Sequence, residues 1–164
     1  MHIGLLSDTH DNLQNLLKAL DIFQQEQPDL LIHCGDITDP ETISLVEGFP
    51  LYCVFGNMDT QHDELRRVVQ DLHPENRAEP MLELEVGCHK LAVVHGDHRR
   101  TLQHLIHSGD YAYVFHGHTH RRRDERVGST HVVNPGALSG PRWGSPSIAM
   151  LDVERDIVRI IDVS

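Results

Sequence analysis

Two kinds of apolar pattern alternate through the first half of this chain, and this alternation limits its fold more than any other feature. Short apolar runs at 2–7, 29–35 and 51–56 have the length and composition of buried strands. Apolar residues recur at helical spacing over 12–25, from 39 to about 48 and over 60–73. Strands that alternate with helices in this way form a parallel sheet with right-handed crossovers.

Local signals mark where the first two helices begin. Asp11 is expected to cap the first helix, with Gln14 three residues later in the capping-box position. Asp39 precedes Pro40 at the start of the second helix, and proline suits the first helical position because its missing N–H is not needed there.

The second half of the chain is richer in strands. Strands are predicted at 81–86, 90–95, 111–116, 121–127, 130–134, 147–153 and 156–162. A fourth helix is indicated by Leu102, Leu105 and Ile106, and it is expected to end near Gly109. The strand at 81–86 alternates apolar and acidic residues, as a strand with one solvated face does. We therefore expect one α/β domain over 1–164, with two packed sheets flanked by helices.

Composition excludes several classes of protein. No apolar run approaches the roughly 18 residues of a membrane span, and Asp8 comes too early for a signal peptide. The net charge of −11 disfavours a protein that coats nucleic acid, because phosphates would be repelled. Three cysteines without a CxxC pair indicate no disulfide framework, and Cys34 and Cys53 are expected to be buried thiols in a reducing cytoplasm.

Metal-capable side chains follow the predicted strands, each just past a strand end. In chain order these are Asp8, His10, Asp36, Asn57, His95, His118 and His120. The carboxyl ends of strands in an open α/β sheet line the crevice in which ligands bind. The chain also has fourteen histidines against two lysines, and histidine is the commonest metal ligand.

The types of these residues indicate more than one metal ion. The Asp8-x-His10 and His118-x-His120 pairs are spaced two residues apart, so both members lie on one side of an extended backbone. Glycines flank the other positions and let the backbone approach a ligand closely. Two aspartates, one asparagine and four histidines exceed the needs of one tetrahedral ion. They suit two borderline metals that share a carboxylate.

The order of these motifs resembles that of the calcineurin-like metallophosphoesterases. The matching segments are Asp8-x-His10, Gly35-Asp36, Gly56-Asn57-x-Asp59, His95-Gly96 and Gly117-His118-Thr119-His120. The short chain and Asn134-Pro135-Gly136 are most similar to the small phosphodiesterase branch that includes the retromer subunit. The resemblance implies a four-layer αββα sandwich of two mixed sheets flanked by helices.

The resemblance also implies a ligand set for two divalent ions. One ion would be held by Asp8, His10, Asp36 and His120. The other would be held by Asp36, Asn57, His95 and His118, with Asp36 bridging. A hydroxide between the ions would attack phosphorus in line. Manganese is the expected metal, and iron, nickel, cobalt and zinc also suit mixed nitrogen and oxygen ligands.

Two positions depart from the family pattern. Met58 stands where many relatives have a histidine that protonates the leaving group, and losing a general acid costs about 10²–10⁴-fold in rate. Asp97 stands where many relatives have a second histidine. Asp97 then either holds water or a ligand, with His98 substituting in proton transfer, or both are solvated loop residues.

Other residues near these motifs have two interpretations each. Asp59 either orients a ligand histidine or caps the helix at 60–73. Arg142 either pairs with a substrate phosphate or lies on the surface. His116 is interpreted as a structural residue at a strand end, and Arg121–Arg123 as a solvated edge. We expect catalytic roles for Asp36, Asn57, Asp59 and His98, and substrate contacts from Asn57 and Arg142.

The sequence therefore predicts a metal-dependent phosphodiesterase with a small substrate. The alternative is an interaction scaffold of the retromer-subunit type, in which the metal site decays. Every implied ligand position holds a competent ligand, which favours the enzyme. A nuclease is disfavoured by the negative charge and by an aromatic content of only 5%. The sequence identifies neither the natural substrate nor the oligomeric state.

Overall fold

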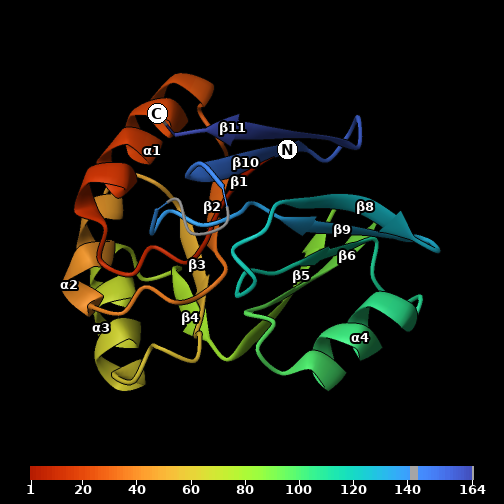
Figure 1. Ribbon diagram of the computed structural model, residues 1–164, viewed down its shortest axis with the longest axis horizontal. Coiled ribbons are helices and arrows are strands. Elements are labelled where there is room, and N and C mark those ends of the chain that lie inside the picture. The colour runs from red at the N-terminus through yellow and green to blue at the C-terminus, as the bar shows by residue number, and fades with distance from the viewer. Residues whose placement is uncertain (141–143, 164) are drawn as a thin grey trace.

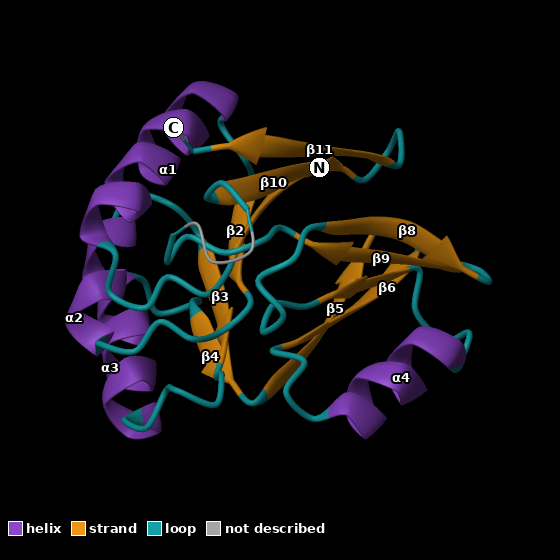
Figure 2. Cartoon of the chain, in the orientation of Figure 1, coloured by secondary structure: helices purple, strands orange, loops and turns teal. Residues whose placement is uncertain are grey.

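Two β-sheets lie face to face in the computed structural model, and helices cover their outer faces (Figure 1). The structure describes residues 1–140 and 144–163. The layers run from α1–α3 through the first sheet and the second sheet to α4, as the purple helices on either side of the orange strands show (Figure 2). The expected four-layer αββα sandwich of two mixed sheets is confirmed.

The first sheet has the strand order β11-β10-β1-β2-β3-β4 among the described residues. Its strands are β1 (His2–Leu6), β2 (Leu30–His33), β3 (Leu51–Val54), β4 (Arg77–Glu79), β10 (Ser147–Asp152) and β11 (Ile157–Asp162). Strands β1 to β4 are parallel, whereas β10 and β11 pair antiparallel. The carboxyl ends of β1, β2 and β3 therefore lie at one edge, as the sequence predicted.

The second sheet has the order β5-β6-β7-β9-β8. Its strands are β5 (Met81–Val86), β6 (His89–Val94), β7 (Tyr113–Phe115), β8 (Arg123–Val127) and β9 (Thr130–Asn134). Its three central strands are parallel, and the hairpins β5–β6 and β8–β9 close its two sides. The parallel strands β6 and β7 bring the loops after them to a common edge.

Apolar stripes fix the helices to the sheets. The helical elements are α1 (Leu13–Glu26), α2 (Pro40–Ile43), the 3-10 helix η1 (Ser44–Val46), α3 (His62–Leu72) and α4 (Arg99–His107). Leu16, Leu20 and Phe23 of α1 are buried, and Leu65 and Val69 of α3 join the same core. A separate apolar core fills the space between the sheets, and a smaller one lies under α4.

Local details differ from the sequence predictions. Asn12, not Asp11, caps α1, and its side chain accepts a hydrogen bond from the N–H of Asn15 at 3.1 Å. Asp11 instead accepts from the N–H of Asp39 at 2.8 Å, which joins the starts of α1 and α2. The short strand β4 was not predicted. Among the described residues, no helix has the length and apolar character to cross a membrane.

Candidate metal centre

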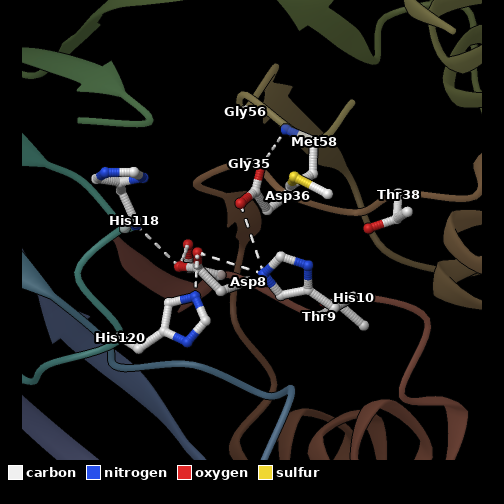
Figure 3. A network of polar contacts seen from close by, with 12 residues as sticks. Asp8, Thr9, His10, Gly35, Asp36, Thr38, Gly56, Met58, His118 and His120 are labelled. Carbon is white, nitrogen blue, oxygen red and sulfur yellow. Dashed lines mark hydrogen bonds and ion pairs between the residues drawn. The ribbon is translucent and has the colours of Figure 1, made fainter. Parts of the chain in front are cut away.

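Two buried aspartates at the strand ends each use one oxygen for hydrogen bonds and turn the other toward histidine side chains (Figure 3). Oδ2 of Asp8 accepts from the Ser7 hydroxyl at 2.6 Å and from the N–H of His118 at 3.0 Å. Oδ1 of Asp36 accepts from the N–H of Met58 at 2.8 Å. Each carboxylate is therefore held in orientation by one oxygen and presents the other.

Histidines surround the presented oxygens. Nε2 of His120 lies 3.1 Å from Oδ1 of Asp8. Oδ2 of Asp36 lies 3.5 Å from Nε2 of His10 and 3.3 Å from Nε2 of His95. Because His10 and His95 come from different strand ends, Asp36 contacts nitrogen ligands from two separate loops. This position is suited to a carboxylate shared by two cations.

Buried polar atoms without hydrogen-bond partners test whether these residues fit a metal. Four such atoms belong to the cluster: Asp8 Oδ1, His10 Nε2, His95 Nε2 and His120 Nδ1. Ligand atoms lie within 4.8 Å of one another in two groups, Asp8 with His10 and His120, and Asp8 with Asp36 and His95. Leaving buried polar atoms unpaired costs free energy, and a bound cation would compensate for it. The residues therefore fit divalent metal ions.

The remaining two predicted ligands lie at the exposed rim of the cluster. Nδ1–H of His118 donates to Oδ1 of Asn57 at 3.0 Å, since the amide oxygen can only accept. The His118 ring packs edge-on against His95, with 5.1 Å between ring centroids. The fold thus brings together all seven side chains that the sequence assigned to metal binding.

The electrostatics of His95 follow from its two neighbours. Nδ1–H donates to the carbonyl of Cys34 at 2.8 Å, which orients Nε2 toward Asp36. Burial alone would lower the pKa of His95, but the carboxylates of Asp36 and Asp8 raise it to about 8. Burial would raise the pKa of Asp36, but His95 and the Met58 N–H bring it below its ordinary value. Binding of a cation would displace the proton from His95.

The backbone at the ligand positions is left-handed, so the extended backbone expected for the Asp8-x-His10 and His118-x-His120 pairs is wrong. Five of the seven predicted ligands have a positive φ, between 43° and 64°: Asp8, His10, Asp36, His118 and His120. Such conformations are costly for residues other than glycine and persist where the surroundings hold them. Contacts between loops do so here. The N–H of Asp8 donates to Gly35 O at 2.9 Å, and that of His10 to Asp36 O at 3.1 Å.

Glycines allow the loops to approach the two carboxylates. A Cβ atom on Gly56 would overlap Oδ1 of Asp36, and one on Gly117 would overlap Oγ of Ser7 and approach Asp8. The Gly-Asn and Gly-His steps are therefore needed for close contact between neighbouring strand ends.

Asp59 does not cap α3, because Gln61 occupies the cap position and α3 starts at His62. The buried Asp59 carboxylate instead accepts three backbone N–H groups, from Asp36 at 2.9 Å, Thr38 at 2.7 Å and Gly56 at 2.7 Å. It joins the loop after β2 to the loop after β3, and so fixes the backbone of Asp36.

Two other predicted residues are not in the buried cluster as the structure describes it. His98 has 84% of its side chain exposed and contacts the Asp97 carboxylate at 2.9 Å. Arg142 lies outside the described residues.

Arg122 and Arg123, which follow the His118 loop, form contacts within the protein, and His116 is part of its interior. Arg122 donates to Ser147 at 3.0 Å and pairs with Asp162. Arg123 pairs with Glu125 at 2.6 Å. His116 is buried, and burial lowers its pKa to about 4.

Two residues around the site escaped the sequence interpretation. Ser7 orients Asp8, and buried His33 connects two loops. The N–H of Gly35 donates to Nδ1 of His33 at 3.1 Å, so the proton is on Nε2, which contacts the Thr9 hydroxyl at 2.7 Å. In the sequence Ser7 directly precedes Asp8 and His33 comes three residues before Asp36, but their hydrogen bonds depend on the fold.

Two facing sheets with aspartate, histidine and asparagine gathered at their strand ends define the class of calcineurin-like phosphoesterases. The sequence profile of the calcineurin-like phosphoesterase superfamily domain matches residues 1–156. The chain belongs to this superfamily.

Similar proteins agree with this assignment. The chain is 37% identical over 163 residues to phosphodiesterase MJ0936 of Methanocaldococcus jannaschii, covering 98% of each chain. It superposes with a TM-score of 0.94 on a solved archaeal phosphodiesterase at 36% identity, covering 99% of both. Zinc-bound Vps29 of Entamoeba histolytica has the same fold, with a TM-score of 0.69 at 16% identity and full coverage of both chains.

Proposed function

We propose that this protein is a dinuclear metal-dependent phosphodiesterase. The observation that carries the proposal is the position of Asp36, whose Oδ2 lies within 3.5 Å of Nε2 of both His10 and His95, which come from separate loops. The unpartnered buried atoms around it support a role in metal binding. The 37% identity to a phosphodiesterase over almost the whole chain supports the diester preference.

The chain's own residues would hold the metals and orient the substrate. Asp8, His10, Asp36 and His120 would hold one ion, and Asp36, Asn57, His95 and His118 the other. When bound, two divalent ions would supply an activated water for in-line attack on phosphorus and would neutralise charge on the phosphate oxygens. Asn57 lies at the exposed rim, where its amide can also contact a phosphate oxygen. Arg142 is proposed as a second substrate contact.

Met58 affects what the site can hydrolyse quickly. Its side chain is exposed at the rim next to Asn57, and a thioether cannot donate a proton. We infer that a leaving group must depart with little help from a general acid, unless His98 supplies the proton from its exposed position. Diesters with acidic leaving groups are therefore expected to react fastest.

The setting of the reaction is proposed from the same features. We propose a small phosphodiester substrate, manganese as the metal, and one catalytic domain over 1–164. A cytoplasmic location is proposed because Cys34 and Cys53 are buried free thiols. The likeness in fold to Vps29 makes a scaffold the second candidate, and the complete set of seven ligands favours the enzyme.

Metal-dependent hydrolysis by purified protein tests this proposal. The protein is stripped with a chelator, single divalent ions are added back, and hydrolysis of bis-p-nitrophenyl phosphate is compared with that of its monoester. We expect hydrolysis only with metal, strongest with Mn²⁺, faster on the diester, and abolished in Asp36→Ala. Metal-independent hydrolysis, or full activity in Asp36→Ala, contradicts the mechanism. A wild-type chain that binds no metal supports the scaffold.

A further inference from the structure

We propose that Asn134, at the end of β9, is a positioning residue that sets the backbone of the His118–His120 loop for metal binding. Asn134 is fully buried and has no place in the predicted ligand set. The inference rests on the proposed function, because it concerns the geometry of two proposed metal ligands.

The amide nitrogen of Asn134 holds the loop on both sides of His118. Nδ2 donates to the carbonyl of Gly117 at 2.8 Å and to the hydroxyl oxygen of Thr119 at 3.1 Å. The N–H of Thr119 also donates to Gly117 O at 2.7 Å, so the loop folds into a tight turn around these groups. His118 and His120 then project from a turn whose middle is fixed by one buried side chain.

The amide oxygen of Asn134 connects this turn to the loop that runs beside Asp8. Oδ1 accepts from the N–H of Gly136 at 2.9 Å. Three residues later, the N–H of Ser139 donates to the carbonyl of Asp8 at 2.9 Å. One side chain therefore links the loop carrying His118 and His120 to a segment bonded to the Asp8 backbone.

The chemistry of the position requires an amide. One atom must donate to two oxygens while the other accepts an N–H, and Asn134 is fully buried, so bulk solvent does not reach these partners. An aspartate would have the same shape but would set an oxygen against Gly117 O. His118 and His120 are also left-handed, at φ 64° and 57°, so they depend on such external contacts to keep their conformation.

A second buried asparagine provides a matched control. Asn76 is 2% exposed, accepts from the N–H of Leu51 at 2.9 Å and donates to Val69 O at 3.2 Å. Leu51 is the first residue of β3, so Asn76 acts at the strand end opposite to the metal site. Asn76→Asp disturbs a similar buried contact without touching the His118–His120 loop.

The experiment measures Mn²⁺ binding by calorimetry in wild type, Asn134→Asp, Asn134→Ser and Asn76→Asp, with thermal unfolding of each metal-free protein. We expect Asn134→Asp and Asn134→Ser each to weaken Mn²⁺ binding about 10–100-fold, because aspartate sets an oxygen against Gly117 O and serine is too short to reach it. Asn76→Asp is expected to lower the melting temperature while its Mn²⁺ affinity stays at the wild-type value.

Histidine resonances of the metal-free proteins provide a reading that does not depend on metal. Those of His118 and His120 should move in the Asn134 variants and stay in place in Asn76→Asp. Wild-type Mn²⁺ affinity in Asn134→Asp, or equal losses in the Asn134 and Asn76 variants, overturns the inference while leaving the proposed function intact. A wild type that binds no Mn²⁺ overturns the proposed function, and unmoved His118 and His120 resonances then overturn the inference as well.

Discussion

Asp36 uses its two carboxylate oxygens for two different kinds of contact. One of its oxygens accepts the Met58 N–H, and the other faces two histidines from separate loops. A carboxylate suits this position because one charged oxygen attracts a cation strongly while its partner oxygen keeps the hydrogen bond. Motif order could predict that Asp36 lies in the site, but which oxygen faces the metals depends on the contact with Met58.

We expect Asp36→Asn to fold and to lose metal binding. Asparagine is the same size and can still accept the Met58 N–H, but its amide presents no negative charge to the cluster. Mn²⁺ affinity and diester hydrolysis should each fall by more than about 100-fold, beyond the loss usual for residues that only orient a ligand. Calorimetry and a chromogenic diester assay measure the two. The control substitution Asp71→Asn, at an exposed position on α3, should leave Mn²⁺ affinity and diester hydrolysis unchanged.

The elements show how far local pattern predicts structure. Among the described residues, buried runs and helical stripes predicted ten of the eleven strands and the four α-helices, because such spacing places apolar side chains on one face. The missed strand β4 has only three residues, Arg77–Glu79, and its pairing with β3 defines it. Loop conformation was likewise out of reach, since the left-handed ligand residues are held by contacts between loops distant in sequence.

Asp59 tests the contribution of contacts between loops. In Asp59→Asn, an NH₂ group replaces an oxygen that accepts backbone N–H groups, so at least one buried donor is left unpaired. The free energy of unfolding should fall by about 1–3 kcal/mol. Mn²⁺ affinity should also fall, because the N–H of Asp36 is one of the three donors. Chemical denaturation and calorimetry measure the two effects.

Asp39→Asn is the matched control for this change. Asp39 caps α2 by accepting the N–H of Glu41 at 3.0 Å, and asparagine caps helices about equally well. Its stability and Mn²⁺ affinity should therefore match wild type. An Asp59→Asn variant as stable and as metal-binding as Asp39→Asn would show that Asp59 does not hold the loops.

Acid should destabilise the whole molecule partly through His33. Burial lowers the pKa of His33 from 6.5 to about 4, so the folded state favours the neutral ring. The stability this contributes is fully present above pH 6.5 and is lost as pH falls toward about 4, a change of roughly 3 kcal/mol. Denaturant titrations of metal-free protein between about pH 7 and about pH 4 measure this loss of stability.

A histidine variant separates this effect from the other titrating groups. His33→Gln removes the buried ring, so its unfolding free energy should fall less steeply with acid than that of wild type. The exposed His107→Gln should keep the wild-type pH dependence. Parallel curves for wild type and His33→Gln would contradict the assignment to His33.

At the scale of the molecule, the sequence already placed the site at the carboxyl edge of the strands. The expected convergence of these side chains is seen because parallel strands bring the loops after them together, as Asp8, Asp36 and His95 illustrate. The supporting residues could not be predicted in the same way. Asn134 and His33 lie in apolar strand segments, and their hydrogen bonds across loops exist only in the folded chain.

The most direct test is an anomalous-difference electron-density map from crystals of this protein grown with Mn²⁺. Two peaks are predicted, one on each side of the Asp36 carboxylate, with His10 and His120 near one and His95 and His118 near the other. A single peak that does not touch Asp36, or no peak in the cluster at all, would contradict a dinuclear centre bridged by this residue.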